Sequence, residues 1–140
     1  MHMNFNELDR TLPNGFHDAE LRHFEMHYVN RTLRFDLVVW IGKMEDAQAR
    51  ELYRPARVTV ASVAFLVLEP PDTNYPWQKA GTICIDTGEG VPKQSSSKVP
   101  NAPEGTAITW MYLKEMNCFL LFAGGEALLE WSGPAENWKP

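Results

Sequence analysis

Three potential metal ligands alternate along one stretch of the sequence, at His23, Glu25 and His27. Residues two apart on an extended strand project from the same face, roughly 7 Å apart along the backbone. Imidazole and carboxylate groups bind zinc, but a zinc site needs further ligands and partners that orient them. The sequence has no HExxH or cysteine cluster to supply them. We therefore expect a solvated polar strand face, with a metal site as the alternative.

A histidine and an aspartate are adjacent at His17 and Asp18, and Glu20 follows closely. A carboxylate beside an imidazole can orient it as a general base. Adjacent side chains on an extended segment point to opposite faces, so we expect His17 and Asp18 to satisfy backbone groups where the first strand begins. The alternative places His17, Asp18 and Glu20 at the rim of a ligand-binding site.

Motifs that present a nucleophile or cradle a phosphate are missing from the sequence, which has no GxSxG, GxGxxG or P-loop pattern. Cys84 and Cys118 lie in apolar runs without CxxC spacing or an electropositive neighbour that would activate a thiol. We expect two buried, reduced cysteines, no cofactor and no catalytic activity.

Aromatic residues outside the predicted strands are a second kind of candidate. Tyr75 and Trp77 follow a proline-rich turn, and Trp138 lies near the end of the sequence. Such rings either fold back on the core or are offered to a partner. Tyr75 and Trp77 are therefore further candidates for ligand binding.

The elements that must position these residues show the two-residue period of β-strands from residue 18 onward. Phe24, Met26 and Tyr28 share a face opposite the two histidines, and residues 33–41 continue the alternation after a short turn at Asn30. This pattern predicts an antiparallel hairpin.

Further strands are predicted at five places, and helix formers at 45–53 predict a short helical turn in a connection. The run 58–68 is nearly free of charge and rich in β-branched residues, as in a central strand. The last three strands are expected to form a meander with turns at 114–116 and 124–125. The five predicted strands are 58–68, 82–86, 107–113, 117–123 and 126–132. Together with the hairpin they predict an all-β fold of about seven mostly antiparallel strands, in a sandwich or partly open barrel.

A chain of 140 residues is expected to form one domain, residues 1–140. Residues 1–13 precede the strand pattern and are predicted to be an N-terminal extension. The segment 87–105 holds three Gly, three Pro and three consecutive Ser, which predicts a long flexible loop. It is either a disordered excursion or a flap over a binding face.

Charge and hydropathy limit the partners of the chain. The 18 acidic residues outnumber the 13 Lys and Arg residues, so a nucleic acid would be repelled. The longest apolar run is too short to cross a bilayer, and no secretory signal is visible. We expect a cytoplasmic protein without nucleic-acid or membrane partners, and an acidic second part that suits a basic protein partner.

The opening segment carries a resemblance. Residues 14–19 read Asn-Gly-Phe-His-Asp-Ala, and 25–33 continue into the predicted hairpin. This stretch resembles small, mostly uncharacterised bacterial β domains with a Phe-His-Asp-Ala/Ser opening, some of them similar to toxin-immunity proteins. The resemblance implies a bacterial binding protein that acts by protein–protein interaction, and it transfers no catalytic residue. The alternative is a small-ligand-binding or enzymatic β-barrel with its site at the barrel mouth.

Overall fold

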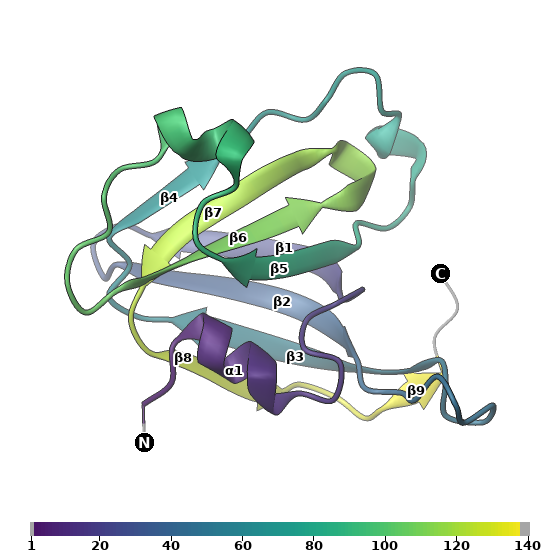
Figure 1. Cartoon of the computed structure of the whole chain (residues 1–140). Coiled ribbons are helices and arrows are strands. Elements are labelled where there is room, and N and C mark those ends of the chain that lie inside the picture. The colour runs from purple at the N-terminus through teal and green to yellow at the C-terminus, as the bar shows by residue number, and fades with distance from the viewer. Residues whose placement is uncertain (1, 138–140) are drawn as a thin grey trace.

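The computed structural model describes residues 2–137 and contains two antiparallel β-sheets packed face to face (Figure 1). The strands are β1 (Glu20–His27), β2 (Thr32–Trp40), β3 (Leu52–Val60), β4 (Phe65–Leu68), β5 (Ile85–Glu89), β6 (Ala107–Leu113), β7 (Cys118–Gly124), β8 (Ala127–Trp131) and β9 (Glu136–Asn137). The larger sheet has the order β1-β2-β3-β8, and β9 also pairs with β3. The smaller sheet has the order β4-β7-β6-β5. The predicted all-β fold is confirmed as a sandwich, because the sheets do not close into a barrel.

The predicted hairpin at the start of the larger sheet is confirmed. β1 and β2 pair with Phe24 opposite Phe35 on the side facing the core and with Glu25 opposite Arg34 on the outward side. Arg31 adopts a φ of 53° in the connecting turn. The alternation of apolar and polar residues therefore sets the register, since a slip by one residue would turn every side chain to the wrong face.

The run 58–68, expected to form one central strand, crosses from the larger sheet to the smaller one. β3 ends at Val60, and β4 begins at Phe65 in the smaller sheet. Between them Ser62 has a φ of 54°, a conformation that few residues other than glycine adopt. The prediction of one strand over 58–68 is wrong because an apolar run has the same composition whether its two halves join one sheet or two.

A second crossing lies beside the first. The backbone N–H of Gly125 donates to Ala61 O, and that of Ala61 donates to Glu126 O, both at 2.8 Å. A Cβ at Gly124 would lie 2.4 Å from Val60 Cγ1, so only glycine permits this approach. The chain passes here from β7 to β8 in the other sheet, and the predicted three-strand meander is therefore wrong.

Residues 1–13, expected as an extension, contribute helix α1 (Phe5–Thr11) to the core. Asn4 and Glu7 form a capping box at its start, a signal present in the sequence. The Phe5 ring is buried and stacks on Phe16 with centroids 4.6 Å apart. The extension is thus part of the domain, because Phe5 fills space between the sheets.

No helix within the described residues is long and apolar enough to span a membrane.

The predicted helical turn at 45–53 is absent from the structure, where residues 44–51 form turns and β3 begins at Leu52. Asp46 Oδ1 accepts the backbone N–H groups of Gln48 and Ala49, at 3.0 and 3.3 Å. An aspartate that bonds nearby backbone groups competes with helix formation. This local competition outweighs the helix propensity of the neighbouring residues.

The segment 87–105 is more ordered than a flexible loop. Its first residues belong to β5, and it contains a 3-10 helix, η2 (Lys93–Lys98). Two further 3-10 helices are η1 (Trp77–Lys79) and η3 (Lys114–Met116). Ser95 is fully buried although the segment is rich in polar residues. The Gly, Pro and Ser content predicted a flexible loop here. Composition alone does not show that one of the serines, Ser95, is buried against the rest of the protein.

Candidate functional site

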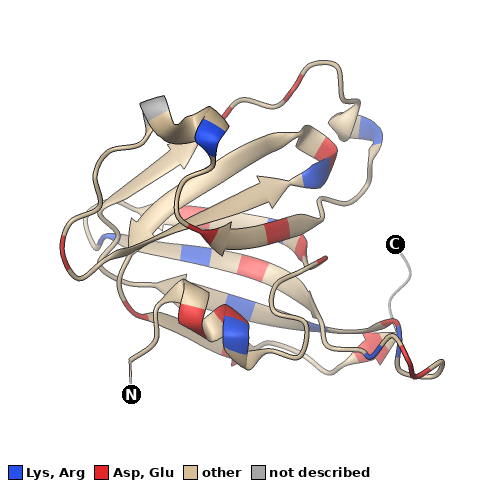
Figure 2. Ribbon diagram, in the orientation of Figure 1, with Lys and Arg blue, Asp and Glu red and all other residues tan. Residues whose placement is uncertain are grey.

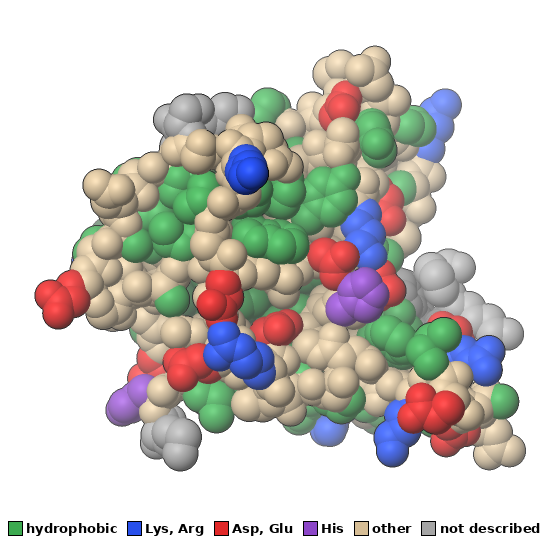
Figure 3. Space-filling view, viewed as in Figure 1, with side chains coloured by type: hydrophobic (Ala, Val, Ile, Leu, Met, Phe, Trp, Pro, Cys, Tyr) green, Lys and Arg blue, Asp and Glu red, His purple; other side chains and the backbone are tan. Residues whose placement is uncertain are grey.

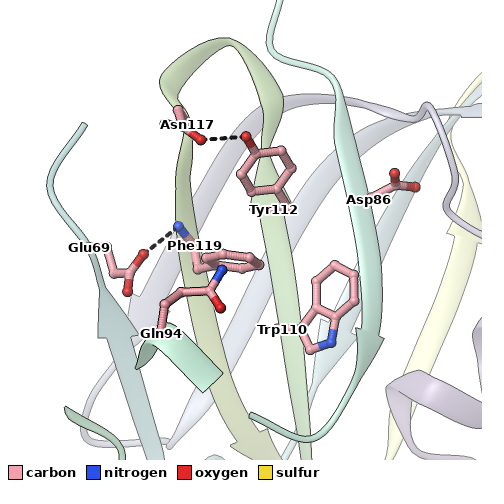
Figure 4. A pocket seen from close by; sticks show the side chains of 7 residues that line it. All are labelled: Glu69, Asp86, Gln94, Trp110, Tyr112, Asn117 and Phe119. Atoms are coloured by element: carbon pink, nitrogen blue, oxygen red, sulfur yellow. Dashed lines mark hydrogen bonds between the residues drawn. The ribbon is translucent and has the colours of Figure 1, made fainter. Parts of the chain in front are cut away.

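A groove of about 490 Å³ lies on the outward face of the smaller sheet (Figure 4). Its floor comes from β6 and β7, and its sides come from β5, η2 and the residue that follows β4. Figure 3 shows hydrophobic side chains gathered on this face of the molecule. We call this site the groove and define it by its lining residues: Glu69, Asp86, Gln94, Trp110, Tyr112, Asn117 and Phe119.

Three half-buried aromatic rings form the floor of the groove. Trp110 and Tyr112 alternate along β6 with buried residues that face the core, and Phe119 of β7 pairs with Tyr112. The Phe119 centroid lies 5.7 Å from that of Trp110 with an interplanar angle of 85°, and 5.0 Å from that of Tyr112. The rings therefore present both faces and edges to the groove.

Gly88 of β5 makes room for the Trp110 indole. The two residues are cross-strand partners, and a Cβ at Gly88 would lie 2.2 Å from the Trp110 ring. Any other side chain would displace the indole. The glycine therefore helps to set the position of this ring in the groove.

Glu69 joins the sheet to the segment that covers part of it. Its Oε1 accepts the backbone N–H of Phe119 at 2.8 Å, and its Oε2 accepts the Ser95 hydroxyl at 2.7 Å. This contact holds η2 against the sheet and places Gln94 at the rim of the groove. This part of 87–105 therefore packs against the outward face of the smaller sheet, which disagrees with a disordered excursion.

A chain of hydrogen bonds orders the end of the groove near η3. The Tyr112 hydroxyl donates to Asn117 Oδ1 at 2.6 Å, and Asn117 Nδ2 donates to Asp72 Oδ2 at 2.9 Å. Hydrogen bonds from the Asn74 backbone and from Asn117 lower the pKa of Asp72. Burial raises the pKa of Tyr112. Tyr112 is therefore a neutral, oriented hydroxyl near pH 7.

Beside the groove lies a charged cluster, defined as His17, Asp18, Asp86 and Lys114. His17 Nδ1 lies 2.5 Å from Asp86 Oδ1, and His17 Nε2 lies 3.2 Å from Asp18 Oδ2. Lys114 bonds to Asp18 and lies 3.8 Å from Asp86 Oδ2. Burial alone would lower the pKa of Lys114, but its hydrogen bond to Asp18 and the charges of both carboxylates raise it.

The expectation that His17 and Asp18 face apart is wrong. Asp18 has a φ of 58°, so the segment is not extended at this point. Its backbone N–H donates to Ile85 O, which fixes the turn against β5, and the His17 side chain contacts Asp86 while that of Asp18 contacts His17 and Lys114. Alternation along a strand does not hold for a residue in the left-handed region.

Glu20 and Trp77 lie together in a different hollow, of about 440 Å³, between β1 and the loop that ends at Ile83. Glu20 is buried, its Oε2 has no hydrogen-bond partner, and Arg22 Nε lies 3.5 Å away. Tyr75 is 42% exposed. The five candidates from the sequence therefore divide among separate places, and Trp138 lies outside the described residues.

His23, Glu25 and His27 share the outward face of β1, as predicted. Glu25 Oε1 lies 3.3 Å from His27 Nε2, and Glu25 also forms an ion pair with Arg34. No group of three or more His, Cys, Asp or Glu residues suited to a metal ion occurs among residues 2–137. Arg34 thus pairs with Glu25, the carboxylate at the centre of the hypothetical metal site.

Cys84 and Cys118 are both free thiols. Burial raises the pKa of each thiol, and the carboxylates of Glu115 and Glu69 raise the pKa of Cys84 and Cys118 further. Both conditions disfavour the thiolate, which is the reactive form of cysteine.

The aromatic floor of the groove and Glu69 were not among the site residues predicted from the sequence. Trp110 and Tyr112 share one face of a strand whose other face is apolar, and this pattern is visible in the sequence. A strand with large rings outward and apolar residues inward must be covered or used on both sides. Phe119 could not be predicted as part of the floor in this way, because its position beside Trp110 and Tyr112 depends on the pairing of β6 with β7.

Comparison with known proteins found no matching family model, curated protein or solved structure. The function is therefore argued from the geometry of the chain itself.

Proposed function

We propose that the protein is a non-catalytic binding protein that acts by protein–protein interaction, with the groove as its contact surface. The observation that carries the proposal is an outward sheet face bearing three half-buried aromatic rings beside two carboxylates. Aromatic residues are enriched at the centre of protein interfaces, and an apolar patch with a polar rim is typical of such a surface.

The charged cluster supports binding rather than catalysis. His17 has a carboxylate at each ring nitrogen, so neither nitrogen is directed at a nucleophile. The Cys84 thiol beside the cluster is half-buried, and its partial burial and the Glu115 carboxylate raise its pKa. General-base catalysis needs one free imidazole nitrogen within reach of the group it deprotonates.

Charge and resemblance together indicate the class of partner. Residues 58–140 carry nine acidic and five basic side chains, which favours encounter with a basic protein. The resemblance of the opening segment to toxin-immunity proteins adds a toxin as the partner that the chain would neutralise. Free cysteines agree with a cytoplasmic setting.

The size of the groove favours a second candidate function, the binding of a small molecule. Ligand pockets commonly measure about 300–1,000 Å³, and the groove falls in this range. The barrel-mouth form of this hypothesis is wrong, because the two sheets do not close into a barrel. A small ligand would instead lie on the sheet face.

Site-specific crosslinking in the source cell tests the proposal. A photoreactive amino acid at position 94 lies at the rim of the groove, and the same group at exposed position 128 of β8 is the matched control. We expect a discrete protein adduct from position 94 and none from position 128. The adduct should disappear when Phe119→Ala is added to the position-94 variant. Equal crosslinking from both positions, or only small-molecule adducts at 94, would contradict the proposal.

A further inference from the structure

We propose that the groove binds an arginine side chain of a protein partner. This inference rests on the proposed function for the identity of the partner, and it names the chemical group that the groove recognises. Its seven lining residues include three aromatic rings, two carboxylates and two amides, and none of them is basic. This combination is complementary to a planar cation.

Glu69 supplies negative charge at one side of the groove. Its two carboxylate oxygens each accept one neutral donor, the Ser95 hydroxyl at Oε2 and the Phe119 N–H at Oε1. A carboxylate has about four lone-pair sites, so acceptor capacity remains on both oxygens. Among the side chains that the structure describes, no cation lies within ion-pair distance of Glu69. An incoming cation would therefore be its first charged partner.

Asp86 differs from Glu69, since His17 and Lys114 already face it. Lys114 is shared with Asp18, so two carboxylates stand against one lysine and one histidine in the charged cluster. Asp86 therefore contributes an oriented acceptor at the opposite side of the groove rather than an unpaired charge. Figure 4 shows Glu69 and Asp86 on opposite sides of the three rings.

The rings favour a guanidinium group over an ammonium group. The planes of Trp110 and Phe119 meet at 85°, which forms a corner in which a flat cation can stack on one ring and meet the other. A guanidinium group stacks on aromatic faces and donates two parallel hydrogen bonds to a carboxylate, whereas an ammonium is a compact, strongly hydrated charge.

The same chemistry already occurs within the chain. The Arg54 guanidinium lies over the Trp131 ring, 4.8 Å from the ring centroid, and its Nε donates to Gly133 O at 2.9 Å. Arg54 thus combines stacking with a hydrogen bond to an oxygen acceptor. In the groove, Trp110 and Glu69 offer a partner's arginine the same two contacts.

Titration of the isotope-labelled full chain with small amides tests the inference by nuclear magnetic resonance. The probes are N-acetyl-arginine amide, its lysine and citrulline counterparts, and methyl glucoside as a neutral sugar. Citrulline keeps the shape of arginine without its charge. We expect arginine amide to shift the Trp110 indole and Gln94 amide signals most, lysine amide less, and citrulline amide and the sugar little. Added salt should weaken the arginine effect, because screening acts on an exposed ion pair.

Glu69→Gln keeps the shape of the side chain and one acceptor oxygen, and it should weaken arginine amide binding at least about fivefold. Glu130→Gln on exposed β8 is the matched control and should leave it unchanged. Equal shifts with citrulline amide, stronger shifts with lysine amide or the sugar, or no shift at the groove would each overturn the inference. A protein adduct from position 94 would still support protein–protein interaction at the groove in that case. The proposed function and the arginine inference can therefore fail separately.

Discussion

The outward faces of the two sheets differ in chemistry although their strands share the same alternation. On the larger sheet the outward positions of β2 and β3 carry charges, among them Arg34, Asp36 and Arg57. On the smaller sheet the corresponding positions carry Trp110 and Phe119. Figure 2 shows charges along β2 and β3 and none along the middle of β6 and β7. A polar outward face can be left to water, whereas an apolar one must be covered or used.

The charged face of the larger sheet contributes solubility more than stability. Arg57 Nε donates to Asp36 Oδ1 at 3.0 Å, and Glu25 pairs with Arg34 across β1 and β2. All four side chains keep contact with solvent. Exposed pairs of this kind contribute little, because water screens them and their ordering costs entropy.

The apolar face of the smaller sheet is partly covered. Leu121 lies on this face, since it pairs with the outward Trp110, yet it is fully buried. The segment with η2 lies over this part of the sheet (Figure 1). We call this segment, which contains η2 (Lys93–Lys98), the cover. Gln94 at its edge lines the groove. One face of the smaller sheet therefore holds both a second small core around Leu121 and the groove that we propose as the contact surface.

The largest expected effect comes from removing apolar volume under the cover. Leu121→Ala should lower the free energy of unfolding by about 2–5 kcal/mol, because it leaves a cavity in a fully buried place. The matched control is Leu128→Ala on the outward face of the larger sheet, where Leu128 is 57% exposed. That change should stay within about 0.5 kcal/mol. Chemical denaturation measures both free energies of unfolding. Equal losses in the two variants would contradict a second small core on the smaller sheet.

A smaller effect is expected from the hydrogen bond that holds the cover. Ser95→Ala removes the buried donor to Glu69 and should cost about 1 kcal/mol. Ser96→Ala is the matched control, since the exposed Ser96 hydroxyl donates only to Lys93 O within η2. Proteolysis within 90–106 should accelerate in the first variant only. Equal proteolysis of both variants would show that Glu69 does not anchor the segment.

The charged face should show weaker coupling than the cover. A double-mutant cycle on Asp36→Ala and Arg57→Ala should give a coupling of about 0.2–1 kcal/mol that falls as salt is added. Denaturation at low and high ionic strength measures it. A coupling that is larger and insensitive to salt would mean that this face stabilises the fold after all.

The smallest effect is a difference in how two carboxylates titrate. The pKa of Glu25 is lowered by its hydrogen bond with His27 and by nearby Arg34, whereas the pKa of Asp72 is lowered by neutral amide donors. A depressed pKa gives stability that is present above the unfolded value and is lost as pH falls through the folded value. Carboxyl titration by nuclear magnetic resonance should show that added salt raises the pKa of Glu25 more than that of Asp72. The reverse order would contradict the assignment of charged partners to one face and neutral partners to the other.

Much of the fold could be predicted because burial on one face leaves a period of two in the sequence. The hairpin around Asn30 is found where that period is clear, whereas the strands at 107–113 and 117–123 were predicted as apolar runs bounded by turn residues. Helix α1 was missed although Asn4 and Glu7 mark its start, since seven residues give too short a pattern. The helix expected at 45–53 was wrong because propensity ignores the Asp46 side chain.

The candidate site could be predicted only in part. His17 and Asp18 were identified as a possible pair, but Asp86 joins them from a distant part of the sequence. Phe119 and Glu69 gave no local signal, because their roles come from strand pairing and from the contact with Ser95. Residues 50 apart in sequence meet there, as the bond between Glu69 and Phe119 shows.

The sequence by itself determined that the chain forms strands, which face of the first hairpin is apolar, and that the second part is acidic. Only the tertiary structure decided which strands are neighbours, how the crossings at Ser62 and Gly124 divide them between two sheets, and where the apolar outward face stays open. The physical reason is that alternation records whether a side chain meets water or protein. It does not record which protein segment it meets, because that depends on contacts between residues far apart in the chain.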